Sequence, residues 1–311
     1  MTRDALIFYS AFDDPAAWRR ALTAELPDLD VRVHPDVGDP QDVCYALVWK
    51  PPAGFFAGFP NLKLVTNLGA GIDSLLGRSD LPPVPISRLS DPGMISLMTS
   101  YVLFAVIRYA RDIPIFERAQ RQRTWCYVHP HALSTIKVGV LGLGELGVPA
   151  ARALADAGFD VRGWSRTQKN LAGLTCVTGR ASLEAFLADT EILVVMLPLT
   201  PETRGLLGAS ELARLPKGAK LINVSRGAVV DEPALIESLR SGQIAEATLD
   251  VFTVEPLPTD HVFWSMDNVL ITPHLASITV PEQAARDVAE SIRRVRAGLA
   301  PLHLTDPGRG Y

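Results

Sequence analysis

The sequence predicts an α/β protein built on two parallel sheets, because short β-branched runs alternate with amphipathic helical patterns along almost the whole chain. The first hundred residues hold strand-like runs at 5–9, 30–34, 45–49 and 62–66. A fresh series begins at residue 136, with runs at 136–142, 160–164, 191–197, 219–224, 246–251 and 268–273. That spacing suits βα units, and six strands complete a doubly wound sheet. We therefore expect two doubly wound, parallel-sheet domains.

Two helical segments connect these series. Residues 100–116 form a long segment rich in Leu, Val, Ile and Phe, which predicts a buried helix crossing from one domain to the other. After the last strand, residues 281–300 predict a helix with a glycine near its end. This helix would return the chain to the first domain.

The composition is that of an ordinary soluble globular protein, with 311 residues, 48% of them hydrophobic and 21% charged. Its net charge of −4 provides no basic field for nucleic acid or for an anionic membrane. An anionic ligand must therefore be bound by a few local Arg and Lys side chains.

The cysteines and the apolar stretches bear on the compartment. Cys44, Cys126 and Cys176 are odd in number and widely spaced, so we expect neither a disulfide framework nor a metal site. The first residues lack the apolar core of a secretory signal, and the longest apolar stretch, around 101–107, is too short to span a bilayer. These observations predict a cytoplasmic protein that does not bind membranes.

A glycine pattern, Gly142-x-Gly144-x-x-Gly147, directly follows the run KVGVL and opens a helical pattern. In this setting the glycines provide a tight turn, close backbone approach to a pyrophosphate, and close helix–strand packing. The helix N-terminus adds N–H groups and a positive dipole. We therefore predict a dinucleotide site on a Rossmann sheet, and the alternative is a plain glycine-rich turn.

The end of the next strand bears on the choice between NAD and NADP, because an NAD site usually has an acidic side chain there. This chain has Trp164-Ser165-Arg166-Thr167, and Asp160 lies at the other end of the strand. Hydroxyls and a guanidinium suit a 2′-phosphate. We predict a preference for NADP(H), with NAD(H) still possible, and the alternative is a solvated basic turn. Glu145 puts an anion inside the glycine loop, and we expect it to point to solvent.

Four polar residues follow or end strands of the second series, on the edge where the glycine loop lies. They are Arg226, Asp250, Glu255 and His274. An imidazole can supply a proton near neutral pH, and a carboxylate beside it, here Glu255, stabilises the imidazolium. Arg226 can bind a carboxylate and polarise a keto oxygen, and Asp250 would orient the nicotinamide or ribose. The set predicts hydride transfer between a nicotinamide cofactor and a small 2-keto or 2-hydroxy acid.

Each of the catalytic candidates also has a structural alternative when it is taken singly. His274 would then be a helix cap, Glu255 a loop charge and Arg226 a surface ion-pair partner. Their convergence on one edge of a parallel sheet favours the catalytic interpretation.

Several segments carry a resemblance to a known family. VSRGAVVDEPAL, TLDVFTVEPLP and TPHLAS resemble signature segments of the D-isomer-specific 2-hydroxyacid dehydrogenase family, and the glycine pattern falls where that family has it. WKPP, NLGAGIDSLL, GWSRTQK and the terminal RGY resemble the glyoxylate/hydroxypyruvate reductase A group within it. The similarity covers essentially the whole chain. It implies a flavodoxin-like substrate domain formed from residues 1–99 and 283–311, with a Rossmann dinucleotide-binding domain inserted at 100–282.

The resemblance also implies roles for residues. Arg226 would be the substrate-binding catalytic arginine, Glu255 its acidic partner and His274 the proton donor, which also contacts substrate. The loop Leu68-Gly69-Ala70-Gly71 would bind the substrate carboxylate through its N–H groups. Trp49 and Lys50 would wall the pocket. The alternatives are a tight turn for the loop, a core or dimer contact for Trp49 and a solvated Lys50.

The expected cofactor contacts share a position at the carboxyl ends of strands in the inserted sheet. They are Gly142, Gly144, Glu145, Leu146, Gly147, Trp164, Ser165, Arg166, Thr167, Leu197, Pro198, Thr203, Val224, Ser225 and Asp250.

The implied reaction is NADPH-dependent reduction of glyoxylate or hydroxypyruvate to glycolate or D-glycerate. The implied assembly is a homodimer formed through the dinucleotide-binding domain. Two alternatives stay open: a dehydrogenase of another short 2-hydroxy acid, and a non-catalytic nucleotide-sensing protein on the same fold. Turnover with short 2-keto acids separates the enzyme from the sensor.

Overall fold

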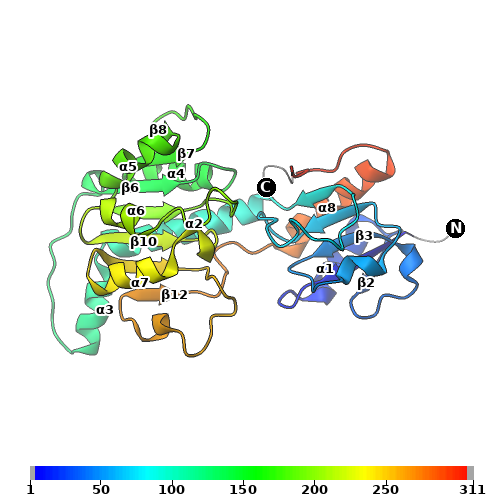
Figure 1. Ribbon diagram of the computed structural model, residues 1–311, viewed down its shortest axis with the longest axis horizontal. Helices are drawn as coiled ribbons and strands as arrows, with labels where there is room; N and C mark the ends of the chain where they lie inside the picture. Colours follow the sequence, from blue (N-terminus) through cyan, green and yellow to red (C-terminus); the bar gives the residue numbers. More distant parts are fainter. Residues whose placement is uncertain (1–3, 307–311) are drawn as a thin grey trace. The chain divides into compact units, whose positions relative to one another are not determined.

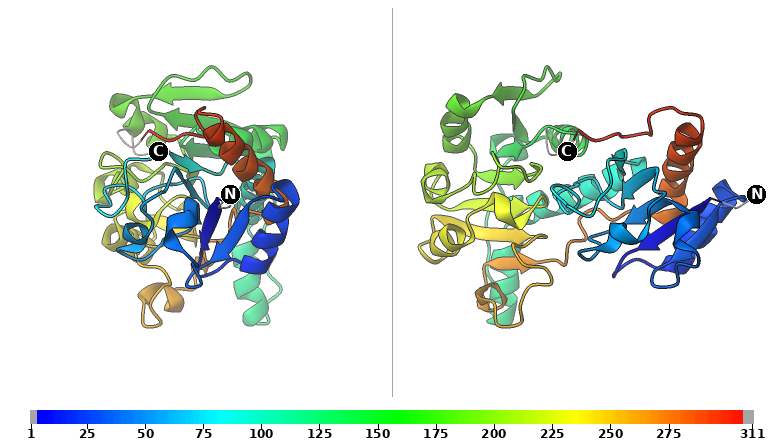
Figure 2. Two further views of the ribbon diagram at one scale, coloured as in Figure 1. Left: turned by 90° about the vertical axis from the view of Figure 1, so that its right-hand side faces the viewer. Right: turned by 45° about the vertical axis from the view of Figure 1, so that its right-hand side comes forward.

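A computed structural model of the chain describes residues 4–306 and shows two compact units. Unit 1 comprises Met1–Met94 and Ile278–Tyr311, and unit 2 comprises Ile95–Ser277. Figure 2 shows the returning segment, orange to red, among the blue elements of unit 1. The chain passes between the two units after residues 94 and 277, whereas the sequence predicted domain boundaries after residues 99 and 282. The terminal RGY, which contributed to the resemblance, lies outside the described residues.

Unit 1 contains a five-stranded, wholly parallel sheet in the order β2-β1-β3-β4-β5. Its strands are β1 (Ala5–Tyr9), β2 (Asp30–Val33), β3 (Val43–Val48), β4 (Leu64–Asn67) and β5 (Ile86–Arg88). The order 2-1-3-4-5 is that of flavodoxin-like sheets, as expected. β5 has only three residues and was not predicted. Its Ser87 forms an isolated antiparallel β-bridge with Leu304 of the returning segment.

Helices α1 (Pro15–Glu25) and α8 (Pro281–Arg296) pack against each other in unit 1. α1 begins where the Asp14 side chain accepts the Ala16 N–H, with proline in the first turn. α8 buries a stripe of residues spaced three and four apart. That stripe shares a core cluster with Trp18 and Leu22 of α1.

Unit 2 contains a seven-stranded parallel sheet in the order β12-β11-β10-β9-β6-β7-β8. Figure 1 shows these strands stacked from β8 to β12. The strands are β6 (Lys137–Leu141), β7 (Asp160–Ser165), β8 (Thr175–Thr178), β9 (Ile192–Val195), β10 (Ala219–Asn223), β11 (Ile244–Leu249) and β12 (Val269–Ile271). The chain order reverses between β6 and β9, which is where doubly wound sheets bind ligands. The unpredicted strand is β8, an edge strand with little apolar alternation.

Helices cover both faces of this sheet. One face has α2 (Pro92–Ala110) and α4 (Gly147–Asp156), and the other has α5 (Arg180–Ala188), α6 (Ala209–Arg214) and α7 (Glu232–Arg240). The helix α3 (Ile113–Arg121) follows α2 in the chain. Short 3-10 turns complete the two units at η1 (Pro40–Asp42), η2 (Phe55–Gly58), η3 (Leu133–Thr135), η4 (Gly227–Val229) and η5 (Val262–Ser265).

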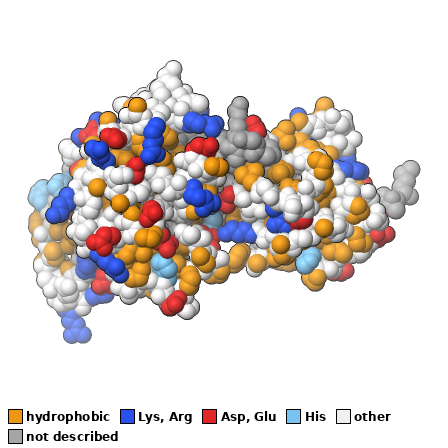
Figure 3. Space-filling model, in the orientation of Figure 1, with side chains coloured by type: hydrophobic (Ala, Val, Ile, Leu, Met, Phe, Trp, Pro, Cys, Tyr) orange, Lys and Arg blue, Asp and Glu red, His pale blue; other side chains and the backbone are white. Residues whose placement is uncertain are grey.

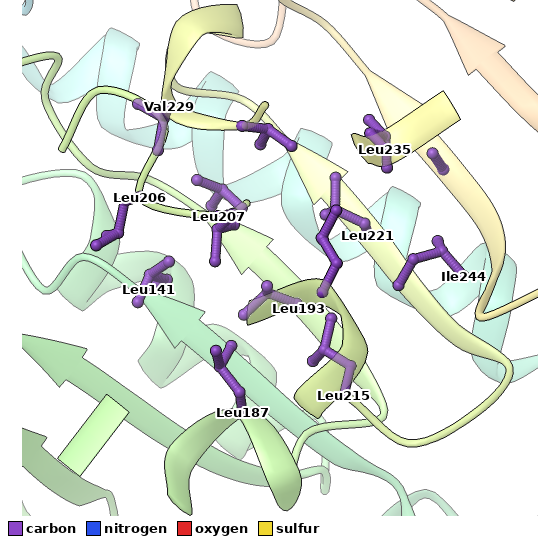
Figure 4. Close-up of a cluster of buried hydrophobic side chains, with 14 of the residues drawn as sticks. Leu141, Leu187, Leu193, Leu206, Leu207, Leu215, Leu221, Val229, Leu235 and Ile244 are labelled. Carbon is purple, nitrogen blue, oxygen red and sulfur yellow. The ribbon is translucent and has the colours of Figure 1, made fainter. Parts of the chain in front are cut away.

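Alternate residues of each central strand enter different core clusters, because side chains of a strand point to opposite faces. Leu193 and Leu221 face the leucine-rich cluster formed with α5, α6 and α7, drawn in Figure 4. Val194 and Ile222 face the cluster formed with α2 and α4. Full burial of one such leucine contributes about 2 kcal/mol. Both faces are therefore apolar, and polar chemistry is left to the strand ends.

The long apolar segment forms two helices where one was expected. α2 ends at Ala110, Asp112 takes a left-handed backbone conformation with φ +54, and Pro114 lies in the first turn of α3. A proline cannot continue the preceding hydrogen-bond ladder, which explains the break. With 19 residues, α2 is long and apolar enough to cross a membrane by length and composition alone, contrary to the expectation from its shorter apolar run. Half of it is buried, and Val102 and Val106 lie in the core.

Candidate active site

The three predicted glycines occupy the turn between β6 and α4, and they differ in their surroundings. Gly142 has φ +120, and a Cβ there would lie 2.6 Å from the Met196 carbonyl oxygen. A Cβ on Gly147 would lie 1.9 Å from the Gly142 carbonyl oxygen, so the helix can start here only with glycine. A Cβ on Gly144 would meet nothing within 4 Å. Gly142 and Gly147 thus shape the turn, and Gly144 is the open position that a pyrophosphate can approach.

The turn after β7 has a fixed backbone and exposed side chains. The Ser165 hydroxyl donates to the Thr167 carbonyl at 2.7 Å, and the Thr178 hydroxyl donates to the Arg166 carbonyl at 2.8 Å. The Arg166 and Thr167 side chains are exposed. Beyond them a pocket is lined by residues that include Gln168, Lys169 and Cys176. Charged side chains of both signs are interspersed on the face shown in Figure 3, so a local cation such as Arg166 matters more than the global field.

Two other predicted cofactor contacts have structural roles. The Trp164 ring is buried in the leucine-rich core, and its indole N–H donates to the Gly179 carbonyl at 3.0 Å. The Thr203 hydroxyl donates to the Pro198 carbonyl at 2.6 Å and closes the turn after β9. Cofactor contacts of these residues stay predictions. Glu145 is exposed, as expected.

The catalytic candidates follow three neighbouring strands of unit 2. Arg226 follows β10, Asp250 directly follows β11, and His274 follows β12. These strands pair in parallel in the order β12-β11-β10, so their carboxyl ends share one edge of the sheet. Strand polarity alone therefore brings the three loops together.

His274 and Glu255 are in direct contact. The His274 Nδ1 lies 2.8 Å from the Glu255 Oε2, and the other carboxylate oxygen accepts the Phe252 N–H at 3.0 Å. Because a carboxylate only accepts hydrogen bonds, Nδ1 carries the proton in this pair. Both side chains are partly buried, with 24% of His274 and 17% of Glu255 exposed. The predicted partnership of the acid with the imidazole is therefore present in the structure.

Asn223 shapes the loop that carries Arg226. Its side-chain oxygen accepts the Ser225 N–H at 3.1 Å and the Ser225 hydroxyl at 2.8 Å, and its amide nitrogen donates to the Arg226 carbonyl at 3.1 Å. Asn223 is only 2% exposed. Sequence reasoning missed this residue, although a polar side chain ending an apolar strand was a usable signal.

Asp250, predicted to contact the cofactor, binds its own chain. Its carboxylate accepts the Leu275 N–H at 2.9 Å, the Ala276 N–H at 3.0 Å and the Thr272 hydroxyl at 2.6 Å. Burial raises the pKa of Asp250 above its ordinary value, although these hydrogen bonds act in the opposite direction. The side chain thus fixes the loop around His274, and its contact with a cofactor stays a prediction.

In unit 1, side chains and main-chain groups hold the carbonyls of the loop Leu68–Gly71. Thr279 donates to the Leu68 carbonyl at 2.7 Å, and Arg88 donates to the Ala70 carbonyl at 3.2 Å. The Asn67 amide donates to the carbonyls of Gly69 and Gly71 at 3.0 and 2.9 Å. These donors fix the peptide planes of the loop.

Trp49 lies directly against this loop. A Cβ on Gly69 would meet the Trp49 ring at 2.7 Å, so the ring packs where a side chain would otherwise be. The Lys50 Nζ lies 5.6 Å from the centroid of the same ring. The structure therefore groups the predicted pair with the predicted loop.

Comparison with known proteins identifies the family. The model of the D-isomer specific 2-hydroxyacid dehydrogenase NAD-binding domain matches residues 103–276. A glyoxylate/hydroxypyruvate reductase A from Yersinia enterocolitica is 41% identical over 98% of this chain and 99% of that protein. The chain belongs to the D-isomer specific 2-hydroxyacid dehydrogenase family. The predicted family, the oxidoreductase class and the α/β fold class are thereby confirmed.

Solved structures of this dehydrogenase family agree along the whole chain. A member from Xanthobacter autotrophicus, in complex with NADPH and MES, is 62% identical with a TM-score of 0.95, covering 99% of this chain and 100% of that one. An NADPH-dependent glyoxylate/hydroxypyruvate reductase from Sinorhizobium meliloti, in complex with NADP and sulfate, is 34% identical with a TM-score of 0.93 and the same coverage.

The glycine turn allows a matched test of this dehydrogenase's cofactor loop. Gly147→Ala should lower the free energy of unfolding by about 2 kcal/mol, because the new methyl group would overlap the Gly142 carbonyl. Gly144→Ala should leave stability unchanged but weaken NADPH binding by roughly 10-fold or more, about 1.4 kcal/mol. Thermal unfolding and fluorescence titration measure the two effects. Wild-type NADPH affinity in Gly144→Ala would contradict the pyrophosphate assignment.

Proposed function

We propose that this chain is an NADPH-dependent reductase of small 2-keto acids, converting glyoxylate to glycolate and hydroxypyruvate to D-glycerate. The observation that carries the proposal is the His274–Glu255 pair at the carboxyl edge of the unit 2 sheet. The proposal is also supported by full-length similarity to proteins named glyoxylate/hydroxypyruvate reductase A. A pair of this kind is what carbonyl reduction needs in addition to a hydride donor.

The pair would protonate the developing alkoxide. Bound NADPH supplies the hydride to the carbonyl carbon. Nδ1 of His274 is engaged by Glu255, so Nε2 is the nitrogen that would give a proton to the substrate oxygen. The Glu255 carboxylate holds the ring through this hydrogen bond and so sets which ring nitrogen would face the substrate. It is held in turn by the Phe252 N–H.

Two further groups would bind the substrate's carboxylate and keto oxygen. Arg226 can donate parallel hydrogen bonds to a carboxylate and polarise a carbonyl. In unit 1, the loop Leu68–Gly71 has its carbonyls held by Asn67, Arg88 and Thr279, an arrangement that would preorganise its N–H groups for an anion. Trp49 and Lys50 would wall the substrate pocket.

The preference for NADPH rests on the turn after β7. Arg166 is exposed on a backbone fixed by Ser165 and Thr178, so its guanidinium can bind a 2′-phosphate without reorganising the turn. The family members from Xanthobacter autotrophicus and Sinorhizobium meliloti were solved with NADPH and NADP.

An initial-rate panel tests the proposed reaction. Purified protein should oxidise NADPH with glyoxylate and hydroxypyruvate faster than with pyruvate or phenylpyruvate. His274→Ala should lower turnover by roughly 100-fold with NADPH binding retained, because the proton donor is lost. NADPH binding without turnover of any short 2-keto acid would instead favour a nucleotide sensor. Near-normal turnover in His274→Ala would remove this residue as the proton donor.

Cofactor selectivity has its own test. Arg166→Ala should weaken NADPH binding by roughly 10- to 100-fold and leave NADH binding nearly unchanged, because only NADPH carries the 2′-phosphate. The control is Arg214→Ala, which removes another exposed arginine of unit 2, one that pairs with Glu184. Equal losses for both cofactors in Arg166→Ala would refute the assignment.

A homodimer through unit 2 is proposed from exposed apolar side chains. Phe104 and Ile107 of α2 are 53% and 41% exposed, and their spacing puts them on one helix face. Beyond α3, Trp125 and Tyr127 are 97% and 79% exposed. Exposed apolar side chains gathered on α2 and just after α3 indicate a surface that binds another protein molecule. From the family resemblance, we propose that a second molecule of this protein covers these side chains.

Oligomeric state tests this interface. Combining Phe104→Asp with Trp125→Ala should convert a dimer to a monomer in sedimentation velocity, because a charge and a lost aromatic contact would disrupt the apolar surface. Phe12→Asp, at a 74% exposed phenylalanine of unit 1, is the control and should remain dimeric. A dimer that survives the double substitution would place the interface elsewhere.

We also place the enzyme in the cytoplasm. Cys44, Cys126 and Cys176 are free thiols, and Cys126 is exposed. Free thiols persist in a reducing compartment.

A further inference from the structure

A chain of hydrogen-bonded side chains runs from the middle of α2 to the loop that carries His274. The Tyr101 hydroxyl lies 2.6 Å from the Thr272 hydroxyl, which lies 2.6 Å from the Asp250 Oδ1. The Thr272 hydroxyl has one hydrogen, and it donates that hydrogen to the carboxylate. The Tyr101 hydroxyl must therefore donate to Thr272. The direction of every bond in the chain is thus fixed.

Asp250 accepts hydrogen bonds from the main chain of residues 274–276, the segment that carries the imidazole. Its carboxylate accepts the N–H groups of Leu275 and Ala276, and its main-chain carbonyl accepts the His274 N–H at 2.8 Å. His274 has φ +57, in the left-handed region that residues other than glycine rarely adopt. Such a conformation persists only when its surroundings hold it. Three bonds to Asp250 help to hold it here, together with a bond from the His274 N–H to the Thr272 carbonyl at 3.1 Å.

The imidazole is therefore fixed at two points by two different acids. Glu255 binds the ring through Nδ1, and Asp250 binds the backbone on either side of the ring's attachment. A change in the Asp250 carboxylate would move the backbone and carry the ring with it. The orientation of that carboxylate depends in part on Thr272 and, through it, on Tyr101.

We propose that Tyr101 and Thr272 are positioning residues for His274, acting through Asp250 to keep the proton donor aligned with the substrate oxygen. This inference rests on the proposed function, in which His274 supplies the proton. The hydroxyl groups themselves take no part in proton transfer. Their effect is on the geometry of the reacting group, to which rates are sensitive on the scale of 1 Å.

A matched control lies on the same helix. Tyr109, two turns further along α2, makes the same kind of bond at the same distance, 2.6 Å, to the Thr248 hydroxyl of β11. Tyr109 is buried, with 4% exposed, whereas Tyr101 is partly buried, and neither Tyr109 nor Thr248 forms a hydrogen bond with Asp250 within the described residues. Loss of the Tyr109 hydroxyl therefore reports the general cost of removing a buried Tyr–Thr bond from α2.

The experiment compares Tyr101→Phe and Thr272→Val with Tyr109→Phe. The first two should lower kcat by about 10-fold or more, with the KM for glyoxylate and the affinity for NADPH within about twofold of wild type. Tyr109→Phe should keep its kcat while losing at least as much thermal stability, because its bond to Thr248 is the more deeply buried of the two. Thr272→Ser, which keeps the hydroxyl, should restore most of the turnover. An unchanged kcat in Tyr101→Phe, or an equal loss in Tyr109→Phe, would overturn the proposal.

Hydrogen exchange separates this inference from the proposed function. The Leu275 and Ala276 amides should exchange faster in Thr272→Val and Tyr101→Phe than in wild type or Tyr109→Phe, whether or not glyoxylate is turned over. Unaltered exchange at both amides would refute the positioning role even in an active enzyme. A wild-type protein without reductase activity would sink the proposed function alone.

Discussion

Parallel pairing of β10, β11 and β12 is the constraint on which the candidate active site depends. Backbone hydrogen bonds fix the register of these strands, so the loops after them leave the same edge of the sheet. Arg226, Asp250 and His274 are distant in sequence and share that edge for this reason. Apolar clusters cover both faces of the sheet, which leaves its ends as the places where polar side chains can be grouped.

Buried polar side chains at strand ends fix the conformations of the loops at the carboxyl edge of each sheet. Asn67, Asn223 and Asp250 are 0%, 2% and 1% exposed. The two asparagines bind main-chain groups of the loop that follows their own strand, and Asp250 binds main-chain groups of the loop after the neighbouring strand β12. A buried polar group without a partner costs about 1–3 kcal/mol, so loop conformations that satisfy it are strongly favoured. The dipoles that would face a ligand are therefore oriented before it arrives.

The fold and the grouping of the candidate catalytic residues could be predicted because both follow from apolar and polar patterns in the sequence. Apolar runs predict the strands. Arg, Asp, Glu and His residues that follow such runs predict the carboxyl edge of the sheet, where Glu255 and His274 are in contact. The half-exposed β8 lacks that pattern, and apolar periodicity does not encode the helix break that precedes Pro114. The position of Trp164 at the end of β7 did not reveal that its ring is buried in the leucine-rich core, and its contact with a cofactor stays a prediction.

The two acids of the β11 loop illustrate why burial decides what a carboxylate does. Asp250 lies inside the protein, where only hydrogen bonds offset the loss of solvation, and main-chain donors occupy it. Glu255 is partly exposed; one of its oxygens accepts the Phe252 N–H and the other contacts the imidazole. One acid therefore fixes the backbone of His274 and the other its ring. An imidazole held in this way would need little reorganisation to act as the proposed proton donor.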